Sequence, residues 1–378
     1  MRKLLSKSKQ EKQMKPILAI EPDEDILLPE KYHKINNLCA IIYDQLTEIY
    51  KEYNYKELSE TTIKFGKETK QTKELKAGKI DPLDWLKHNE LNDEIELVIT
   101  KQMVLAVGSD FINFMFESMY CAKRGKMTVA YALLRKPITD ELLIFEQLLG
   151  DRNGFINRFF HSGMLDEYDP SNKNLDKQQI IQQAIDKLRI NLFPSSDFIY
   201  DLRYNKAYAS GINGITNHAL HIVTKDKNYR TLEQNLNFVF SNEEDMNEYY
   251  EHYYNLVPYL LIYSVSVIDE LIFSILTDED NQHLRTVKEF RRIIGLILLT
   301  EYTNVTQKRK NKSIFKNITK DLKFICPKCG KENKIDRADC ELFFETEVFL
   351  CTKCFENLLS TKDSVKIIEK AMGINNCP

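Results

Sequence analysis

The sequence predicts a mainly α-helical protein, a multi-helix body followed by a small C-terminal β structure. Three observations support this fold class. The 378 residues include only 12 glycines and 10 prolines, few for a turn-rich β protein of this length. Apolar residues recur at helical spacing through most of the chain. Two close cysteine pairs stand near the C-terminus, where residues 343–350 have the composition of a short strand.

Composition and charge limit the classes of protein to consider. Hydrophobic residues make up 43% of the chain, enough for a sizeable core, and the net charge of -3 implies no general attraction to nucleic acid. The basic start, MRKLLSKSKQEKQMK, lacks the apolar stretch of a secretory signal. The longest apolar run, residues 257–268, ends at Asp269 and Glu270, short of a membrane span. We therefore expect a cytoplasmic protein with no membrane partner.

Several elements have recognisable starts. Apolar residues at helical spacing begin near Tyr32, and Asp81 followed by Pro82 is typical of a helix N-terminus. Residues 241–244, SNEE, read as a capping box, and residues 284–299 close the helical body. The expected organisation is a charged N-terminal tail (1–30), a helical domain (31–304) with a lysine-rich connector near 56–80, a basic linker (305–323), a cysteine-bearing segment (324–358) and a C-terminal tail (359–378).

The cysteine pairs predict a metal site. Cys326 and Cys329 stand in CPKCG, Cys351 and Cys354 in CTKC, and 21 residues separate the inner two. Each Cys-x-x-Cys turn can direct two sulfurs toward one point, and cysteine pairs in the cytoplasm are metal ligands more often than disulfides. We expect one structural zinc ion per chain, with iron as the alternative. Four thiolates leave no open position for catalysis.

This segment resembles the zinc ribbon family, two cysteine knuckles on a small β-hairpin sheet, over residues 324–358 only. The first knuckle matches the family pattern, with Pro327 and Gly330 around its turn. The second has Thr352 where proline is common and Phe355 where glycine is common. The remaining cysteines lack a partner at ligand spacing and are expected to be bystander thiols, namely Cys39, Cys121, Cys340 and Cys377.

The charge of the C-terminal region leaves two kinds of partner open. Residues 326–358 carry five Lys or Arg against seven Asp or Glu, which disfavours phosphate binding by the ribbon itself. The preceding linker has the opposite balance and supplies candidate nucleic-acid contacts, namely Lys308, Arg309, Lys310 and Lys312. Linker and ribbon can together bind nucleic acid. Docking of the ribbon onto the helical body or a protein partner is slightly favoured.

A possible polar site lies in residues 201–224. His218 and His221 are three residues apart and share a helix face, and a bend can bring Asp201 and Arg203 against them. These four side chains would suit general acid-base chemistry. Packing histidines held by backbone carbonyls are the favoured alternative.

The helical body is also similar, faintly, to uncharacterised bacterial helical proteins, some of which belong to RNA-cleaving domains of toxin and phage-defence systems. Those nucleases carry an arginine and a histidine four to six residues apart, a pair that this sequence lacks. The resemblance implies a helical fold. We therefore expect a binding or regulatory module, with phage defence as a candidate setting. The alternative is a metal-independent ribonuclease that uses Arg203, His218 and His221.

Overall fold

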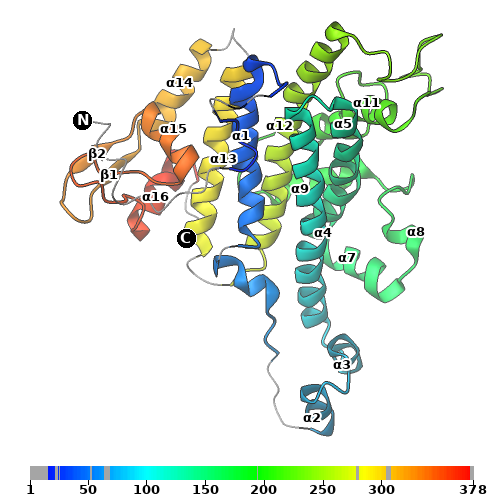
Figure 1. Cartoon of the computed structure of the whole chain (residues 1–378). Coiled ribbons are helices and arrows are strands. Elements are labelled where there is room, and N and C mark those ends of the chain that lie inside the picture. The colour runs from blue at the N-terminus through cyan, green and yellow to red at the C-terminus, as the bar shows by residue number, and fades with distance from the viewer. Residues whose placement is uncertain are drawn as a thin grey trace.

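The protein is mainly helical, as predicted, with one small antiparallel sheet near its C-terminus (Figure 1). The computed structural model describes residues 16–21, 24, 26–51, 53–63, 69–193, 195–277, 281–303 and 308–374. Within the first half of the chain the helices are α1 (His33–Glu48), α2 (Lys70–Lys76), α3 (Pro82–His88), α4 (Asn92–Lys123), α5 (Met127–Lys136), α6 (Leu142–Gly150), α7 (Arg152–Ile156), α8 (Leu165–Tyr168) and α9 (Lys177–Lys187).

Helices continue through the second half until the small sheet. They are α10 (Ser196–Arg203), α11 (Ile212–Leu220), α12 (Glu243–Phe273), α13 (Asn281–Thr303), α14 (Lys308–Thr319), α15 (Arg337–Thr346) and α16 (Lys362–Ala371), with strands β1 (Lys323–Ile325) and β2 (Glu332–Lys334) between α14 and α15. Short 3-10 helices cover Glu30–Tyr32 and Tyr53–Ser59, and short π-helices cover Pro137–Glu141 and Asn157–Ser162.

Three long helices, α1, α12 and α13, lie side by side at the centre of the molecule (Figure 1). Helix α12 is apolar on every side after Leu256 and is buried accordingly. It is long and apolar enough to cross a membrane by length and composition, and 83% of its most apolar stretch is buried inside the protein, as in a core helix. Its Asp269 is enclosed and paired with Arg292 of α13.

Several predicted helix starts can be compared with the structure. Asp81 accepts hydrogen bonds from the amides of Leu83 and Asp84, as expected of an N-cap. The capping box of α12 uses Asn242 and Asp245, one residue later than the sequence suggested. The lysine-rich connector contains α2, and its residues 64–68 lie outside the described part of the chain.

The second half of the expected N-terminal tail is packed against the helical body. Residues 1–15 lie outside the described ranges. Leu18 and Leu28 are buried, and Asn36 of α1 donates a hydrogen bond to the carbonyl of Leu18. Burial of these leucines against α1 explains the difference, because apolar side chains leave water wherever a partner surface is available.

The C-terminal region is more helical than its composition suggested. The expected basic linker contains α14, whose buried Phe315 gives it an anchoring side chain. The expected strand at 343–350 is wrong, because α15 covers Arg337–Thr346 and buries Cys340, Phe343 and Phe344 at helical spacing. The expected tail contains α16, which packs against α13 with Ile368 buried.

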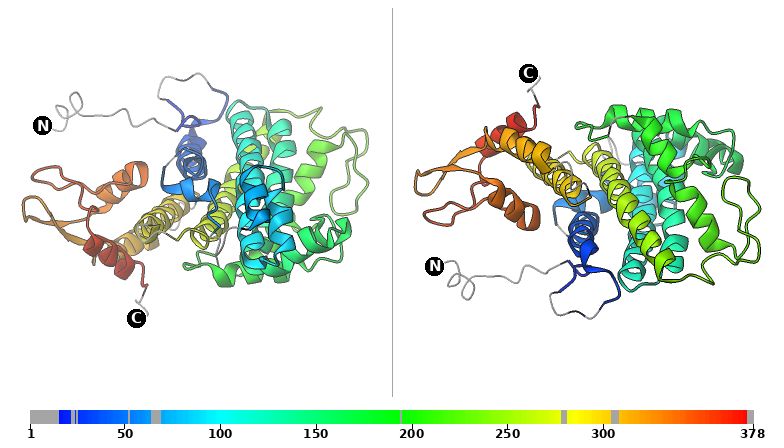
Figure 2. Two further views of the ribbon diagram at one scale, coloured as in Figure 1. Left: turned by 90° about the horizontal axis from the view of Figure 1, so that it is seen from below. Right: turned by 90° about the horizontal axis from the view of Figure 1, so that it is seen from above.

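Helices α14–α16 and the β1–β2 hairpin lie together at one end of the molecule, beside α13 (Figure 1). Figure 2 shows the same region, in orange and red, at the opposite end from the green helices. The buried residues of both ends belong to one continuous hydrophobic cluster. The cysteine-bearing segment is therefore packed against the helical body.

Candidate metal centre

Four cysteine sulfurs meet between the two knuckles. The Sγ atoms of Cys326, Cys329, Cys351 and Cys354 all lie within 4.8 Å of one another. Those of Cys326 and Cys354 are 3.5 Å apart, and those of Cys329 and Cys351 are 3.6 Å apart. A tetrahedral ion with bonds of about 2.3 Å would hold its sulfurs about 3.8 Å apart, whereas a disulfide needs about 2.05 Å. The arrangement can hold a metal ion.

Both knuckles are built by the same backbone hydrogen bonds. In the first, the amide of Cys326 donates to Lys331 and that of Gly330 donates to Cys326, at 2.9 and 3.0 Å. In the second, the amide of Cys351 donates to the carbonyl of Glu356, and that of Phe355 donates to the carbonyl of Cys351, each at 2.9 Å.

The two turns also share a left-handed residue at the equivalent position. Gly330 has φ of 68° and Phe355 has φ of 58°. Phenylalanine thus adopts the conformation that glycine would take at lower cost. The departure from the family pattern at Phe355 leaves the turn intact, at the expense of backbone strain.

The second departure, Thr352 in place of proline, has a structural use. The amide and hydroxyl of Thr352 both donate to Oδ1 of Asn333, each at 2.9 Å, and a proline could donate neither bond. The amide group of Asn333 then lies 3.7 Å from the sulfur of Cys351. Asn333 is buried in β2, so Thr352 fixes a polar group beside one ligand.

Hydrogen bonds favour the thiolate of Cys351. Burial raises its pKa, but hydrogen bonds from the backbone amides of Cys354 and Lys353, and from the thiols of Cys329 and Cys326, outweigh burial and lower the pKa to about 6. The amide nitrogen of Lys353 is 3.5 Å from that sulfur. Since a thiolate is the form that binds metal, these amides prepare the site. With four protein ligands the site would be closed, which makes it structural.

Aromatic side chains attach this centre to α13. Phe290 of α13 packs on Phe343, with ring centroids 5.3 Å apart, and Phe343 stacks on Phe349 at 4.6 Å. Phe349 in turn lies against Phe324 of β1. A Cβ atom at Gly295 would lie 2.8 Å from the ring of Phe344, so glycine lets α15 approach α13 closely.

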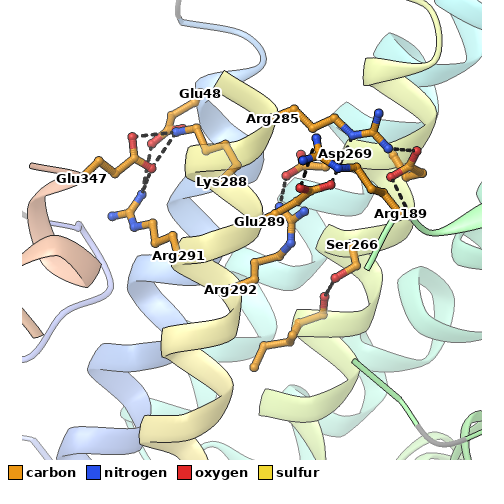
Figure 3. Close-up of polar contacts among 12 residues, drawn as sticks. Glu48, Arg189, Ser266, Asp269, Arg285, Lys288, Glu289, Arg291, Arg292 and Glu347 are labelled. Atoms are coloured by element: carbon orange, nitrogen blue, oxygen red, sulfur yellow. Dashed lines mark hydrogen bonds and ion pairs between the residues drawn. The ribbon is translucent and has the colours of Figure 1, made fainter. Parts of the chain in front are cut away.

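An ionic cluster joins α1, α13 and the end of α15 (Figure 3). Lys288 of α13 is 1% exposed and contacts Glu48 of α1 and Glu347, the residue after α15. Arg291 bonds Glu347 at 2.6 Å and the carbonyl of Phe344 at 2.7 Å. On another side of α13, Arg189 bonds Glu369 of α16 at 2.8 Å. Buried charges therefore fix the position of the metal-bearing segment.

We expect the Lys288→Met variant to lose about 3 kcal/mol of unfolding free energy, because it leaves Glu48 and Glu347 partly buried without this cation. Arg291 stays beside both acids, which keeps the loss below that of an isolated buried charge. Denaturant unfolding would measure it. Lys187→Met, at an exposed lysine, is the matched control and should leave stability within experimental error. Equal stability of the two variants would contradict the proposed contribution of Lys288.

The other cysteines are placed as follows. Cys340 is buried in α15, where burial raises its pKa to about 12, and it lies outside the four-sulfur cluster. Cys39 and Cys121 are buried in α1 and α4. Cys377 lies outside the described residues.

The proposed polar site in residues 201–224 takes a different form. Arg203 is fully buried and bonds Glu146 at 2.5 Å, the carbonyl of Ile138 at 2.8 Å and the hydroxyl of Tyr204 at 2.8 Å. Tyr263 completes the cluster by donating to Glu146 at 2.6 Å. This arrangement is a buried ion pair enclosed by protein, in which Oε2 of Glu146 has no hydrogen-bond partner among the described residues.

The other three residues of the expected polar site, Asp201, His218 and His221, do not contact Arg203 through hydrogen bonds or ion pairs among the described residues. His218 lies 2.6 Å from the carbonyl of Tyr229 through Nε2, and His221 is exposed at the end of α11. Asp201 accepts a bond from Asn205 at 2.7 Å. No hydrogen bond or ion pair between described residues links any two of Asp201, Arg203, His218 and His221. The geometry therefore gives no support to a catalytic group made from these four.

The predicted nucleic-acid contacts fall at the start of α14. Lys308, Arg309, Lys310 and Lys312 belong to this helix, and their side chains lie outside the described part of the protein. The same helix continues with exposed Lys316, followed by Lys320 just after its end.

Comparisons of the chain with protein-family models, curated proteins and solved structures find no match.

Proposed function

We propose that this protein is a zinc-stabilised nucleic-acid-binding module of the cytoplasm. The ion is assigned as zinc because a closed, tetrahedral set of four thiolates is the typical structural zinc site. The proposed contact surface is formed by α14 and the β1–β2 hairpin. It is called the basic surface and comprises Lys316, Lys320, Lys323, Lys331 and Lys334.

The carrying observation is a pair of like charges on the hairpin. Lys323 and Lys334 are directly opposite in the β1–β2 register, on its exposed face. Like charges at paired positions are unfavourable in the free protein, and a bound phosphate would relieve that repulsion. None of the basic-surface lysines has an ion-pair partner among the described residues. Lys328, nearby, is paired with Glu356 at 3.2 Å.

Most of the acidic side chains between positions 326 and 358 form hydrogen bonds or ion pairs within the protein. Asp336 and Asp339 form the capping box of α15. Glu341 bonds Arg337, and Glu347 bonds Lys288 and Arg291, as described above. The excess of acids in the sequence therefore overstates the negative charge that this region offers to a ligand. The hairpin lysines remain available for counterion release.

Replacement of four of these lysines tests the proposal. The variant Lys316→Gln, Lys320→Gln, Lys323→Gln and Lys334→Gln should bind a short DNA duplex more weakly. Its log-log salt dependence should be shallower by roughly three to four units if each lysine neutralises one phosphate. Fluorescence anisotropy at several salt concentrations would measure both quantities, and an RNA duplex of the same sequence would show which nucleic acid is preferred.

The matched control changes the same net charge elsewhere. Lys73, Lys79, Lys173 and Lys187 are exposed on or near α2, α8 and α9. Their replacement by Gln should leave the salt dependence close to that of the unmodified protein. Equal losses in both variants would indicate nonspecific charge attraction, and no loss in either would remove nucleic acid as the partner of the basic surface.

A further inference from the structure

A second feature of the molecule is a hollow of about 370 Å³ beside α10 and α12. Aromatic rings of Phe198, Tyr208 and Tyr259 line it, with Leu202 and Leu256 beneath. The leucines are buried, whereas Tyr208 is 39% exposed. This size and mixed lining are typical of small-molecule sites.

Carboxylates stand at the same hollow. Glu248 and Glu251 are exposed on α12, three residues apart and so on one helix face, and both line the hollow. Neither forms an ion pair with another described residue. No Lys or Arg is found among the described residues that line the hollow. Its net charge is therefore negative, beside an aromatic wall.

His252 adds no compensating positive charge. Its Nδ1 lies 3.0 Å from the hydroxyl of Tyr131, whose proton is directed to the carbonyl of Tyr249 at 2.8 Å. Burial lowers the pKa of His252 below its ordinary value, which keeps the ring neutral near pH 7. Besides the two tyrosines, the polar residues that line the hollow are Glu248, Glu251, His252, Asn255 and Ser210, and none of them is positively charged.

We propose that this hollow binds a small organic cation whose charged group is attached to an apolar body. The carboxylates of Glu248 and Glu251 would attract the charge, and the faces of Phe198, Tyr208 and Tyr259 would contact it and cover the apolar part. A neutral apolar ligand would leave the carboxylates without a counterion. An anion would meet repulsion from both.

This site is independent of the proposed nucleic-acid contact. Tyr208 and Ser210 of the hollow directly precede α11, which lies across the molecule from β1 and β2 (Figure 1). The carboxylates also have the opposite charge to the basic surface. Loss of either activity would therefore leave the other measurable.

Titration of the full chain with benzyltrimethylammonium tests the proposal. Calorimetry, or chemical-shift changes of residues in α12, would detect binding. We expect saturable binding that weakens about tenfold in Glu248→Gln/Glu251→Gln and several-fold in Tyr208→Leu, because the first variant loses the counter-charges and the second a ring. Benzyl alcohol, an uncharged aromatic probe, should bind about tenfold more weakly than the cation.

The control variant is Glu243→Gln/Glu244→Gln, which removes the same charge from the first turn of α12 outside the hollow. It should bind the cation like the unmodified protein. The proposal is overturned if the cation shows no saturable binding, if benzyl alcohol binds equally well, or if both double variants behave alike. Thermal melts of each variant would establish that the fold is retained.

Discussion

Replacing Cys326 or Cys351 with Ser should abolish metal binding and detach the C-terminal region from α13. The effect is expected to be large, because a structural zinc site contributes about 10–16 kcal/mol of apparent binding free energy at pH 7. If the metal-bearing segment were an independent domain, the helical body would survive this change. The structure predicts a wider effect, since Phe343 packs on Phe290 and Glu347 pairs with Lys288.

Hydrogen exchange and a thermal melt would measure the extent of that loss. We expect residues 323–374 to lose protection and the remaining helices to melt at a lower temperature than in the unmodified protein. Cys340→Ser is the matched control, because it changes a buried cysteine of the same segment that lies outside the sulfur cluster. It should keep the metal even if it lowers stability. Metal loss in Cys340→Ser, or its retention in Cys326→Ser, would show that the ligands are misassigned.

Replacing Arg203 with Met should lower the free energy of unfolding by about 3–5 kcal/mol, because Glu146 would remain buried without its cation. Both side chains are 0% exposed, so water cannot compensate the charge. Chemical denaturation would measure the change. The double variant Arg203→Met/Glu146→Leu should recover part of it, since both charges are then removed.

This experiment also separates a structural arginine from a catalytic one. A structural role predicts that any loss of function in Arg203→Met follows the loss of folded protein. If the variant were fully stable, the buried ion pair would have no structural importance. If, in addition, ribonuclease activity were present in the unmodified protein and lost in the variant, the alternative function would be supported.

Much of the fold could be predicted from local patterns. Few turn-forming residues and apolar residues at helical spacing indicate helices wherever tertiary packing does not oppose them. Asp81 before Pro82 identified a helix start because a cap depends on neighbouring residues alone. The four cysteines were recognisable for the same reason, since each knuckle is a local turn.

The sequence-based predictions were wrong where tertiary contacts determine the structure. Residues 343–350 are rich in aromatic and β-branched types, yet Cys340, Phe343 and Phe344 form the buried side of a helix, and the two phenylalanines contact α13. A local signal was present in Asp336 and Asp339, which cap α15. The pairing of Arg203 with Glu146 had no such signal, because 57 residues separate the two. Composition likewise could not show that Glu347, near the metal centre, is paired with Lys288 and Arg291 of α13.

The most direct test of the metal centre is X-ray absorption combined with elemental analysis on freshly purified, never-chelated protein. We predict one zinc ion per chain, bound by four sulfurs at about 2.3 Å. Cys351→Ser should lose this signal. Protein that is folded and free of metal, or a zinc shell that contains nitrogen or oxygen ligands in place of sulfur, would contradict a structural four-thiolate centre formed by Cys326, Cys329, Cys351 and Cys354.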